Sequence, residues 1–207
     1  MSQKLLFIRR ALGPVKLLAD FNFTGHLHKV LQPIQAEDPI NNLGERSVHL
    51  TRKPRLLEGF SLNQNRTFES VIRTPVTYSL DKGNRSATLT VPALKPGVNF
   101  FPHPYHVLYG FVLALGIVHD LSYDAKSKAY ESHTEYTDFR PAIVYSDWRH
   151  ANVNADELTL QISTDNIPPD SHHTLILSVG IRYGTIDNDM TNDQAKSPGS
   201  AKILAVV

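Results

Sequence analysis

Cysteine is absent from this chain of 207 residues, and so are the features of several common protein classes. Without cysteine there can be no disulfide, no thiolate nucleophile and no thiolate-ligated metal. The formal net charge is only +1, whereas nucleic-acid-binding proteins usually carry a strongly basic face. The composition therefore predicts neither a disulfide-stabilised scaffold nor a nucleic-acid partner.

Long hydrophobic runs are also missing. Arg9-Arg10 interrupts the N-terminal run Leu5-Leu6-Phe7-Ile8, and a secretory signal needs roughly 7–15 apolar residues. The apolar stretch from His106 to Val118 is shorter than the about 20 residues of a membrane helix. We therefore expect no signal peptide and no membrane span. The chain is expected to be made in the cytoplasm, from which it could join an assembly.

Familiar catalytic motifs are missing too. The sequence contains no Gly-x-Ser-x-Gly motif, no glycine-rich phosphate loop and no local nucleophile-and-base arrangement. Catalytic groups can converge from distant positions, so a metal-dependent enzyme stays an alternative. It would require at least three ligands from the loop carboxylates and the histidines, such as His103, His106, His172 and His173, to meet in one cleft. The sequence favours a non-enzymatic protein.

Alternation of apolar and polar residues predicts half-buried strands over residues 87–91 and 158–163. Residues 76–80 precede the first of these strands, and the turn signal Asp81-Lys82-Gly83-Asn84 between them predicts a hairpin. We expect Gly83 and Asn84 to supply the positive φ angles of that turn. Residues 57–62 are a further strand candidate.

Two segments are apolar on both faces of a strand, and a third is an uninterrupted apolar run. Residues 106–118 and 175–186 predict central strands that are covered on both sides, and residues 202–207 predict an apolar C-terminal strand. Together the segments predict an α+β chain that is mainly β, with a short N-terminal helical segment and an antiparallel β-sandwich of about eight strands.

The N-terminal part of the chain is basic and helix-compatible. Pro14 suits a first helical position, and the apolar spacing of Leu27, Leu31 and Ile34 predicts that residues 14–36 are mostly helical. Pro33 should end or kink this helix. We therefore expect an N-terminal arm and helical segment over residues 1–43 and a β-sandwich domain over residues 44–207.

Four short segments of the sequence follow one another in a recognisable order. They are Gly44-Glu45-Arg46-Ser47-Val48, Leu57-Glu58-Gly59-Phe60-Ser61-Leu62-Asn63, Pro75-Val76-Thr77 and Leu89-Thr90-Val91-Pro92. In this order they resemble a family of small uncharacterised proteins from Bacteroidota, which have a basic helical N-terminal region and a C-terminal β-sandwich. The resemblance implies that architecture and a bacterial source, and it brings no established activity. The N-terminal region here is shorter than is typical of that family.

One acidic segment is a candidate Ca²⁺ site. Asp187, Asp189 and Asp193 are interspersed with amide and hydroxyl oxygens, which are ligands that suit a hard cation. The segment is not an EF-hand, because its sixth position is Asn192 and its twelfth is Pro198. The alternative is a polar loop between the last two strands, where Asp and Asn favour turns. No cofactor other than calcium is expected.

A candidate binding platform surrounds the single tryptophan. Trp148 and Tyr145 could stack on the apolar face of a sugar ring, while Asp147 and Arg149 bond its hydroxyl groups. The alternative is that Trp148 packs at the core or edge of the sandwich and the charged groups face water. The sequence leaves both interpretations open.

The function that the sequence favours is a structural or self-assembling subunit of a fibre, tube, particle or surface layer. This hypothesis depends on the missing catalytic motifs, the apolar and basic N-terminal arm, and the apolar C-terminal strand. Self-association into a homo-oligomer would then use those two terminal segments, unless the last strand pairs inside its own chain. A carbohydrate- or protein-binding β-sandwich module is the first alternative.

Overall fold

Two long antiparallel strands form the centre of the molecule. The structure is a computed structural model that describes residues 5–42, 45–131, 134–186, 192–194 and 199–207. Strand β3 (Leu108–His119) pairs with β9 (His173–Ile186) from the Leu108–Gly184 pair to the His119–His173 pair. Both strands are buried over most of their length, so the central strands expected from the sequence are confirmed.

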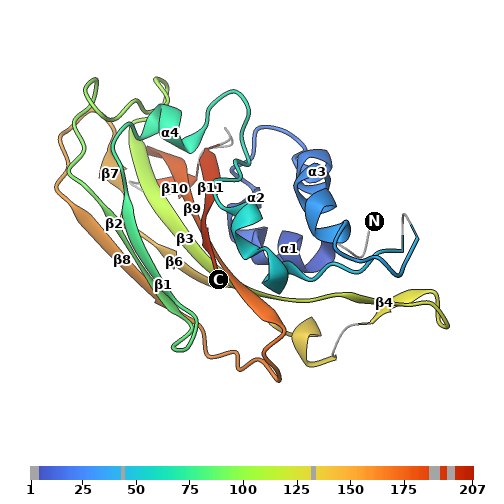
Figure 1. Cartoon of the computed structure of the whole chain (residues 1–207). Coiled ribbons are helices and arrows are strands. Elements are labelled where there is room, and N and C mark those ends of the chain that lie inside the picture. The colour runs from blue at the N-terminus through green and yellow to red at the C-terminus, as the bar shows by residue number, and fades with distance from the viewer. Residues whose placement is uncertain (1–4, 43–44, 132–133, 187–191, 195–198) are drawn as a thin grey trace.

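Further strands extend this pair into a six-stranded antiparallel sheet. On one side, β6 (Ala142–Tyr145) and β7 (Arg149–His150) pair with β3. On the other side, β10 (Asn192–Gln194) and β11 (Ser200–Val206) pair with β9. A separate two-stranded hairpin, β4 (Ser122–Asp124) and β5 (Ala129–Glu131), extends beyond the end of β3 (Figure 1).

The second sheet has three strands in the order β1 (Thr77–Asp81), β2 (Ser86–Val91) and β8 (Leu158–Ser163). The β1–β2 hairpin is confirmed, but its turn differs from the expected one. Arg85, with φ 50°, is the residue with positive φ in this turn, rather than Gly83 or Asn84. The carboxylate of Asp81 holds the turn, because it accepts hydrogen bonds from the backbone N–H and the side-chain amide of Asn84.

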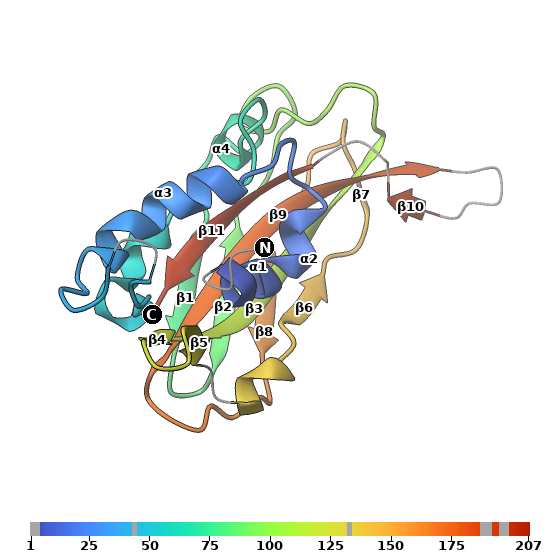
Figure 2. The same ribbon diagram turned by 90° about the vertical axis from the view of Figure 1, so that its right-hand side faces the viewer.

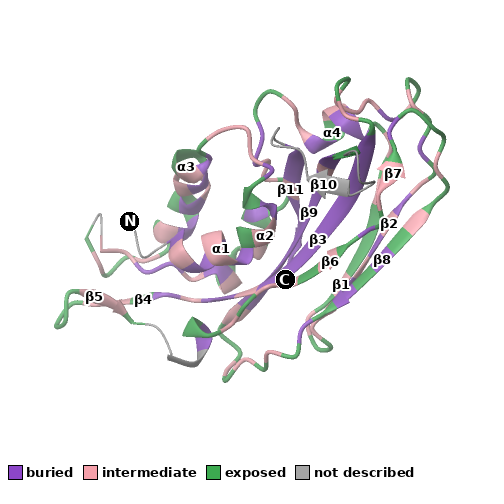
Figure 3. Cartoon of the chain, turned by 180° about the vertical axis from the view of Figure 1, so that it is seen from behind, coloured by how far each residue is buried: buried purple, intermediate pink, exposed green. Residues whose placement is uncertain are grey.

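The two sheets share one apolar core. Alternate residues of the three-stranded sheet, including Leu89 and Leu160, pack with Phe111 and Leu177 on one face of the six-stranded sheet. Figures 1 and 3 show the resulting order of layers: the three-stranded sheet, the six-stranded sheet and then the N-terminal helices. The protein is thus mainly β, with antiparallel sheets and few helices.

The helices cover the opposite face of the six-stranded sheet (Figure 2). They are α1 (Leu6–Ala11), α2 (Gly13–Lys16) and α3 (Thr24–Gln35). Helix therefore begins before residue 14, and it is interrupted between α2 and α3. Helix α3 continues through Pro33 and ends two residues later at Gln35, so the proline stands in the last turn.

Short helical elements occupy the connections between these layers. They are the 3₁₀ helices η2 (Leu50–Arg52), η3 (Pro54–Leu57) and η4 (Thr134–Thr137), and the single α-turn α4 (Phe68–Val71). The strand expected over residues 57–62 is not formed. The chain turns at Gly59, which has φ 76°, and then runs extended beside β11.

The C-terminal strand is paired inside its own chain. One side of β11 bonds to β9. On its other side, the N–H of Gly59 donates to the carbonyl of Ile203 at 2.9 Å, and the N–H of Leu62 donates to the carbonyl of Ala201 at 2.9 Å. Leu5, Phe7, Ile8 and Leu12 of the N-terminal segment are buried as well. Both terminal segments therefore contribute to the core of their own chain.

Candidate functional site

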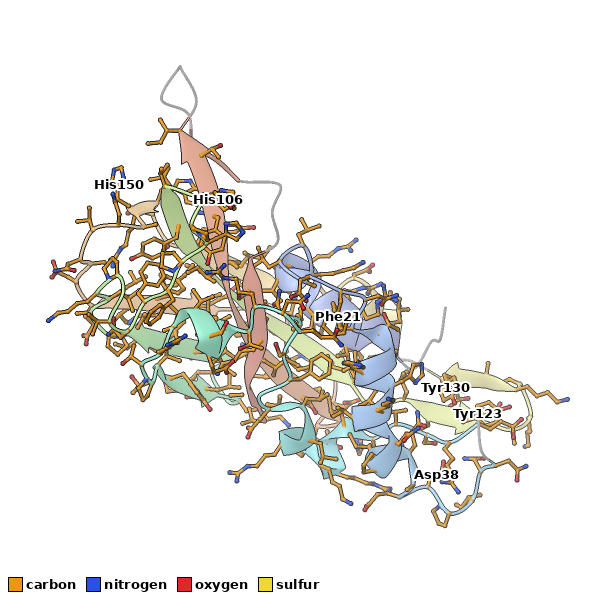
Figure 4. The ribbon with its side chains drawn as sticks, turned by 90° about the horizontal axis from the view of Figure 1, so that it is seen from above. Phe21, Asp38, His106, Tyr123, Tyr130 and His150 are labelled. Carbon is orange, nitrogen blue, oxygen red and sulfur yellow. The ribbon has the colours of Figure 1, made fainter. Side chains whose placement is uncertain are left out.

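A polar pocket lies beyond the end of β3, between η2, the β4–β5 hairpin and the loop before β9. It has a volume of about 830 Å³. Figure 4 places Tyr130 at this end of the molecule, opposite the end that carries His106. The side chains that line the pocket are almost all polar: His49, Thr51, Arg52, His119, Asp120, Ser122, Tyr130, Glu131, Asp170 and His172.

An isolated bridge between distant parts of the chain forms the first wall. Val48 and Leu121 exchange two backbone hydrogen bonds, at 2.8 and 2.9 Å. Opposite residues of an antiparallel pair share a face, so this bridge places His49 beside Asp120. The backbone N–H of Thr51 donates to Oδ1 of Asp120 at 3.1 Å, and the hydroxyl of Thr51 donates to Oδ2. Asp120 is thereby fixed at the start of the pocket.

The second wall is built around Asp170. Its Oδ1 accepts hydrogen bonds from the hydroxyl of Tyr136 at 2.9 Å and from the backbone N–H of His172 at 2.8 Å. Behind this carboxylate, the buried ring of His119 packs between Phe7 and Tyr136, with centroid distances of 4.1 and 4.5 Å. Hydrogen bonds therefore hold the carboxylates of Asp120 and Asp170 on the two walls, and the packed ring of His119 lies beneath them.

The β4–β5 hairpin supplies an aromatic edge. The rings of Tyr123 and Tyr130 lie 5.3 Å apart, and the hydroxyl of Tyr130 donates to the carbonyl of Arg46 at 3.2 Å. Burial raises the pKa of Tyr130 to about 12, and the neighbouring Tyr123 and Glu45 act in the same direction. Tyr130 therefore stays uncharged and keeps its hydrogen bond across the physiological pH range.

The chemistry of this lining suits a ligand that donates many hydrogen bonds. Asp120, Glu131 and Asp170 are acceptors when ionised, and Ser122 and Thr51 add hydroxyl groups. Nε2 of His49 lies 3.1 Å from the hydroxyl of Ser122. Across the described ranges, no group of three or more His, Asp or Glu side chains is arranged to hold a metal ion.

The predicted binding platform is arranged differently from the expectation. The guanidinium of Arg182 stacks between Tyr145 and Trp148, at 4.4 and 4.1 Å from the ring centroids. Arg182 also donates to the carbonyl of Ser146 at 3.2 Å. One face of each aromatic ring is thus occupied by the chain's own arginine rather than open to a sugar.

The two charged members of the predicted platform do not join this stack. Asp147 is exposed. Arg149 donates to the backbone carbonyl of Asp156 at 2.8 Å and lies opposite Tyr109 on β3. The structure therefore brings Tyr145 and Trp148 together through Arg182, whereas Arg149 bonds to Asp156 and does not join them.

The predicted calcium ligands are Asp187, Asp189 and Asp193. Asp187 and Asp189 lie outside the described residues. Asp193 lies in β10, where its backbone is opposite Thr185, and its side chain is not described. Calcium binding at this segment stays a prediction.

Sequence reasoning missed the pocket because its contacts are long-range. Thr51 and Asp120 are separated by 69 positions, and His49 and Ser122 by 73. The one local signal was the pair His119-Asp120, which directly follows an apolar strand. Polar side chains at the end of a buried strand are well placed to line a site at the edge of a sheet.

Comparison with known proteins adds no assignment: no family model, no curated protein and no solved structure matches the chain. Among the described helices, none is long and apolar enough to cross a membrane.

Proposed function

We propose that this chain is a binding module with a β-sandwich fold, and that its polar pocket binds a hydroxyl-rich small ligand such as a carbohydrate. The observation that carries this proposal is the pair of fixed carboxylates, Asp120 and Asp170, on two walls of one pocket of about 830 Å³. Carboxylates that are already oriented can accept hydrogen bonds from adjacent hydroxyl groups without losing further side-chain freedom.

Two further features support a sugar as the ligand. Tyr130 lines the pocket beside these acceptors, and an aromatic ring can pack on the apolar face of a sugar ring. Arg52 and the imidazoles of His49 and His172 supply donors to the same space. A polar pocket with a few aromatic and charged groups can thus bind and orient a polyhydroxylated molecule.

The test is a titration of the full chain with a panel of neutral mono- and oligosaccharides, in which binding is measured by calorimetry and by NMR. We expect saturable binding that shifts resonances of pocket residues. Glu131→Gln should weaken it about tenfold, because a charged hydrogen-bond acceptor is lost. Glu157→Gln is the matched control, since Glu157 is also exposed but does not line the pocket. Equal affinities of parent and Glu131→Gln would contradict the proposal, as would a panel without any ligand.

A second candidate function is a structural subunit that self-associates through β6 rather than through its termini. Strand β6 pairs with β3 on one side and has no second strand partner in the described part of the chain. Its side chains Ile143 and Tyr145 are 44% and 52% exposed. An edge strand with exposed apolar side chains favours pairing with a second copy.

A bacterial source and membership of the Bacteroidota family are also proposals, and they are supported only by the four sequence segments that resemble that family.

A further inference from the structure

A second cluster of polar side chains lies at the opposite end of the sheets, where β3 begins and β9 ends. Tyr109 and Tyr183 are register partners there, and they are 0% and 1% exposed. Neither buried hydroxyl forms a hydrogen bond of normal geometry with a described residue. Each nevertheless lies within reach of a donor, which is the side chain of Arg149 for Tyr109, and the side chain of Arg66 with the backbone of His103 for Tyr183. Buried polar groups in folded proteins are normally paired, so two adjacent hydroxyl groups without a well-formed hydrogen bond call for an explanation.

The neighbours of these tyrosines are cations. Arg149 lies beside Tyr109, and Arg66 lies beside Tyr183. Arg66 donates to the backbone carbonyls of Phe101 and Pro102, at 2.8 and 2.6 Å, while its Nε stays buried without a partner. Neither arginine forms an ion pair with a described carboxylate.

Two imidazoles complete the cluster. The ring of His106 stacks on Tyr183 with a centroid distance of 5.4 Å, and it lies 4.8 Å from the ring of His103. Neither ring nitrogen of His106 has a partner in the part of the chain that is described. Burial lowers the pKa of both imidazoles; Arg66 lowers that of His103 further, and His103 lowers that of His106 further.

We propose that these side chains form an oxyanion-binding site, which takes inorganic phosphate or the phosphate group of a small ester. The donor cluster consists of Arg66, His106, Tyr109, Arg149 and Tyr183. Guanidinium groups and hydroxyl donors match the geometry and charge of phosphate oxygens. A water molecule could pair the hydroxyl groups, but it would leave the two guanidinium charges without a counterion among the described residues. This site is separate from the carbohydrate pocket and does not depend on it.

Inorganic phosphate is the probe for the first experiment. Thermal unfolding of the full chain is measured over a phosphate series, with chloride added to keep the ionic strength constant. We expect a saturable rise in Tm. Tyr183→Phe should weaken the apparent phosphate affinity about tenfold, because a hydrogen bond to a charged ligand is lost. The same variant should lower the Tm without phosphate only slightly, since it removes a hydroxyl that forms no hydrogen bond of normal geometry with a described residue.

Tyr136→Phe is the control for this experiment. Tyr136 is equally buried, but its hydroxyl already donates to Asp170. This variant should lose stability without phosphate and keep the phosphate-dependent rise. The proposal is overturned if parent and Tyr183→Phe respond to phosphate alike, or if the rise never saturates, because either result indicates a general salt effect.

NMR provides a second readout that a purely structural role would not change. Phosphate should raise the pKa of His106, because an adjacent anion favours the imidazolium form, whereas Arg66 and His103 oppose it. Glycerol phosphate distinguishes an ester ligand from the free anion. Binding of both compounds, or of either one, supports the site, and an unchanged His106 titration in the presence of both overturns it.

Discussion

Asp38 is a single residue that organises the loop after α3. Its Oδ1 accepts hydrogen bonds from the N–H groups of Ile40 and Asn41, at 3.0 and 3.2 Å. Its Oδ2 accepts from the side chain of Asn41 at 2.8 Å and from the N–H of Ser47 at 2.7 Å. Partial burial raises the pKa of Asp38, but these hydrogen bonds outweigh it and hold the pKa well below its usual value of 3.8.

Asp38→Asn should therefore destabilise the protein at neutral pH. We expect a loss of about 1–3 kcal/mol in the free energy of unfolding, because an amide offers one acceptor oxygen where the carboxylate offers two. A carboxyl group whose pKa is lowered by folding contributes stability that is complete above its unfolded pKa and is lost as the pH falls through the folded value. Urea unfolding at pH 7 and pH 3 measures both effects.

The pH dependence separates this role from a simple packing defect. The difference between parent and Asp38→Asn should shrink at pH 3, where the parent has begun to lose its own charge-dependent stability. Asp156→Asn serves as the control, because Asp156 is exposed and its carboxylate has no such set of donors among the residues that the structure describes. An Asp38→Asn variant with parental stability at pH 7 would contradict the assigned role.

At the scale of elements, small residues on the six-stranded sheet allow the N-terminal helices to pack closely. A Cβ atom at Gly116 would lie 2.4 Å from the Cβ of Ala11 and 2.7 Å from its Cα. A Cβ atom at Gly180 would lie 2.3 Å from Cδ1 of Leu18. Helix α1 can therefore lie this close to the sheet only because β3 carries glycine at position 116, whereas at Gly180 the nearest atom is the flexible end of the Leu18 side chain.

Gly116→Val should force α1 away from the sheet. Because the clash involves backbone atoms of the helix and not only a flexible side chain, we expect a loss of at least about 1–3 kcal/mol. Gly13→Ala is the control, since a Cβ atom there meets nothing within 4 Å and alanine favours helix over glycine by about 1 kcal/mol. Thermal unfolding should show Gly116→Val below the parent and Gly13→Ala at or above it. A Gly116→Val variant of parental Tm would show that α1 can shift freely.

The elements also show which parts of the fold are predictable from sequence. Alternation at Leu89 and Leu160, and the two-faced apolar runs of β3 and β9, depend on burial patterns that are local in the chain. The local pattern of residues 57–62 predicts a strand that is not formed, because a positive φ angle at Gly59 and a bond to distant Ile203 are not visible in such a pattern. The pocket was missed for the same reason, since Thr51 meets Asp120 only through the folded chain.

At the scale of the whole molecule, both terminal segments stabilise the fold. Leu5, Phe7, Ile8, Ala11 and Leu12 belong to the core between the helices and the sheet, and β11 is bonded along both of its sides. Removal of residues 1–13 or 202–207 would therefore expose core residues of the remaining chain. A change of particle size after such a truncation could result from unfolding as well as from the loss of a contact between subunits, so truncation does not distinguish the two.

A substitution on β6 is the sharper test of self-association. If copies pair through this edge, the parent should have a mass well above the 23.2 kDa of one chain in light scattering. Ile143→Lys should return it to one chain's mass, because a charged side chain at an exposed edge position opposes strand pairing. Ile167→Lys is the control, since Ile167 is 71% exposed but lies outside the strands. A parent of single-chain mass, or an Ile143→Lys variant that stays associated, would exclude β6 as the interface and leave ligand binding as the better explanation of this fold.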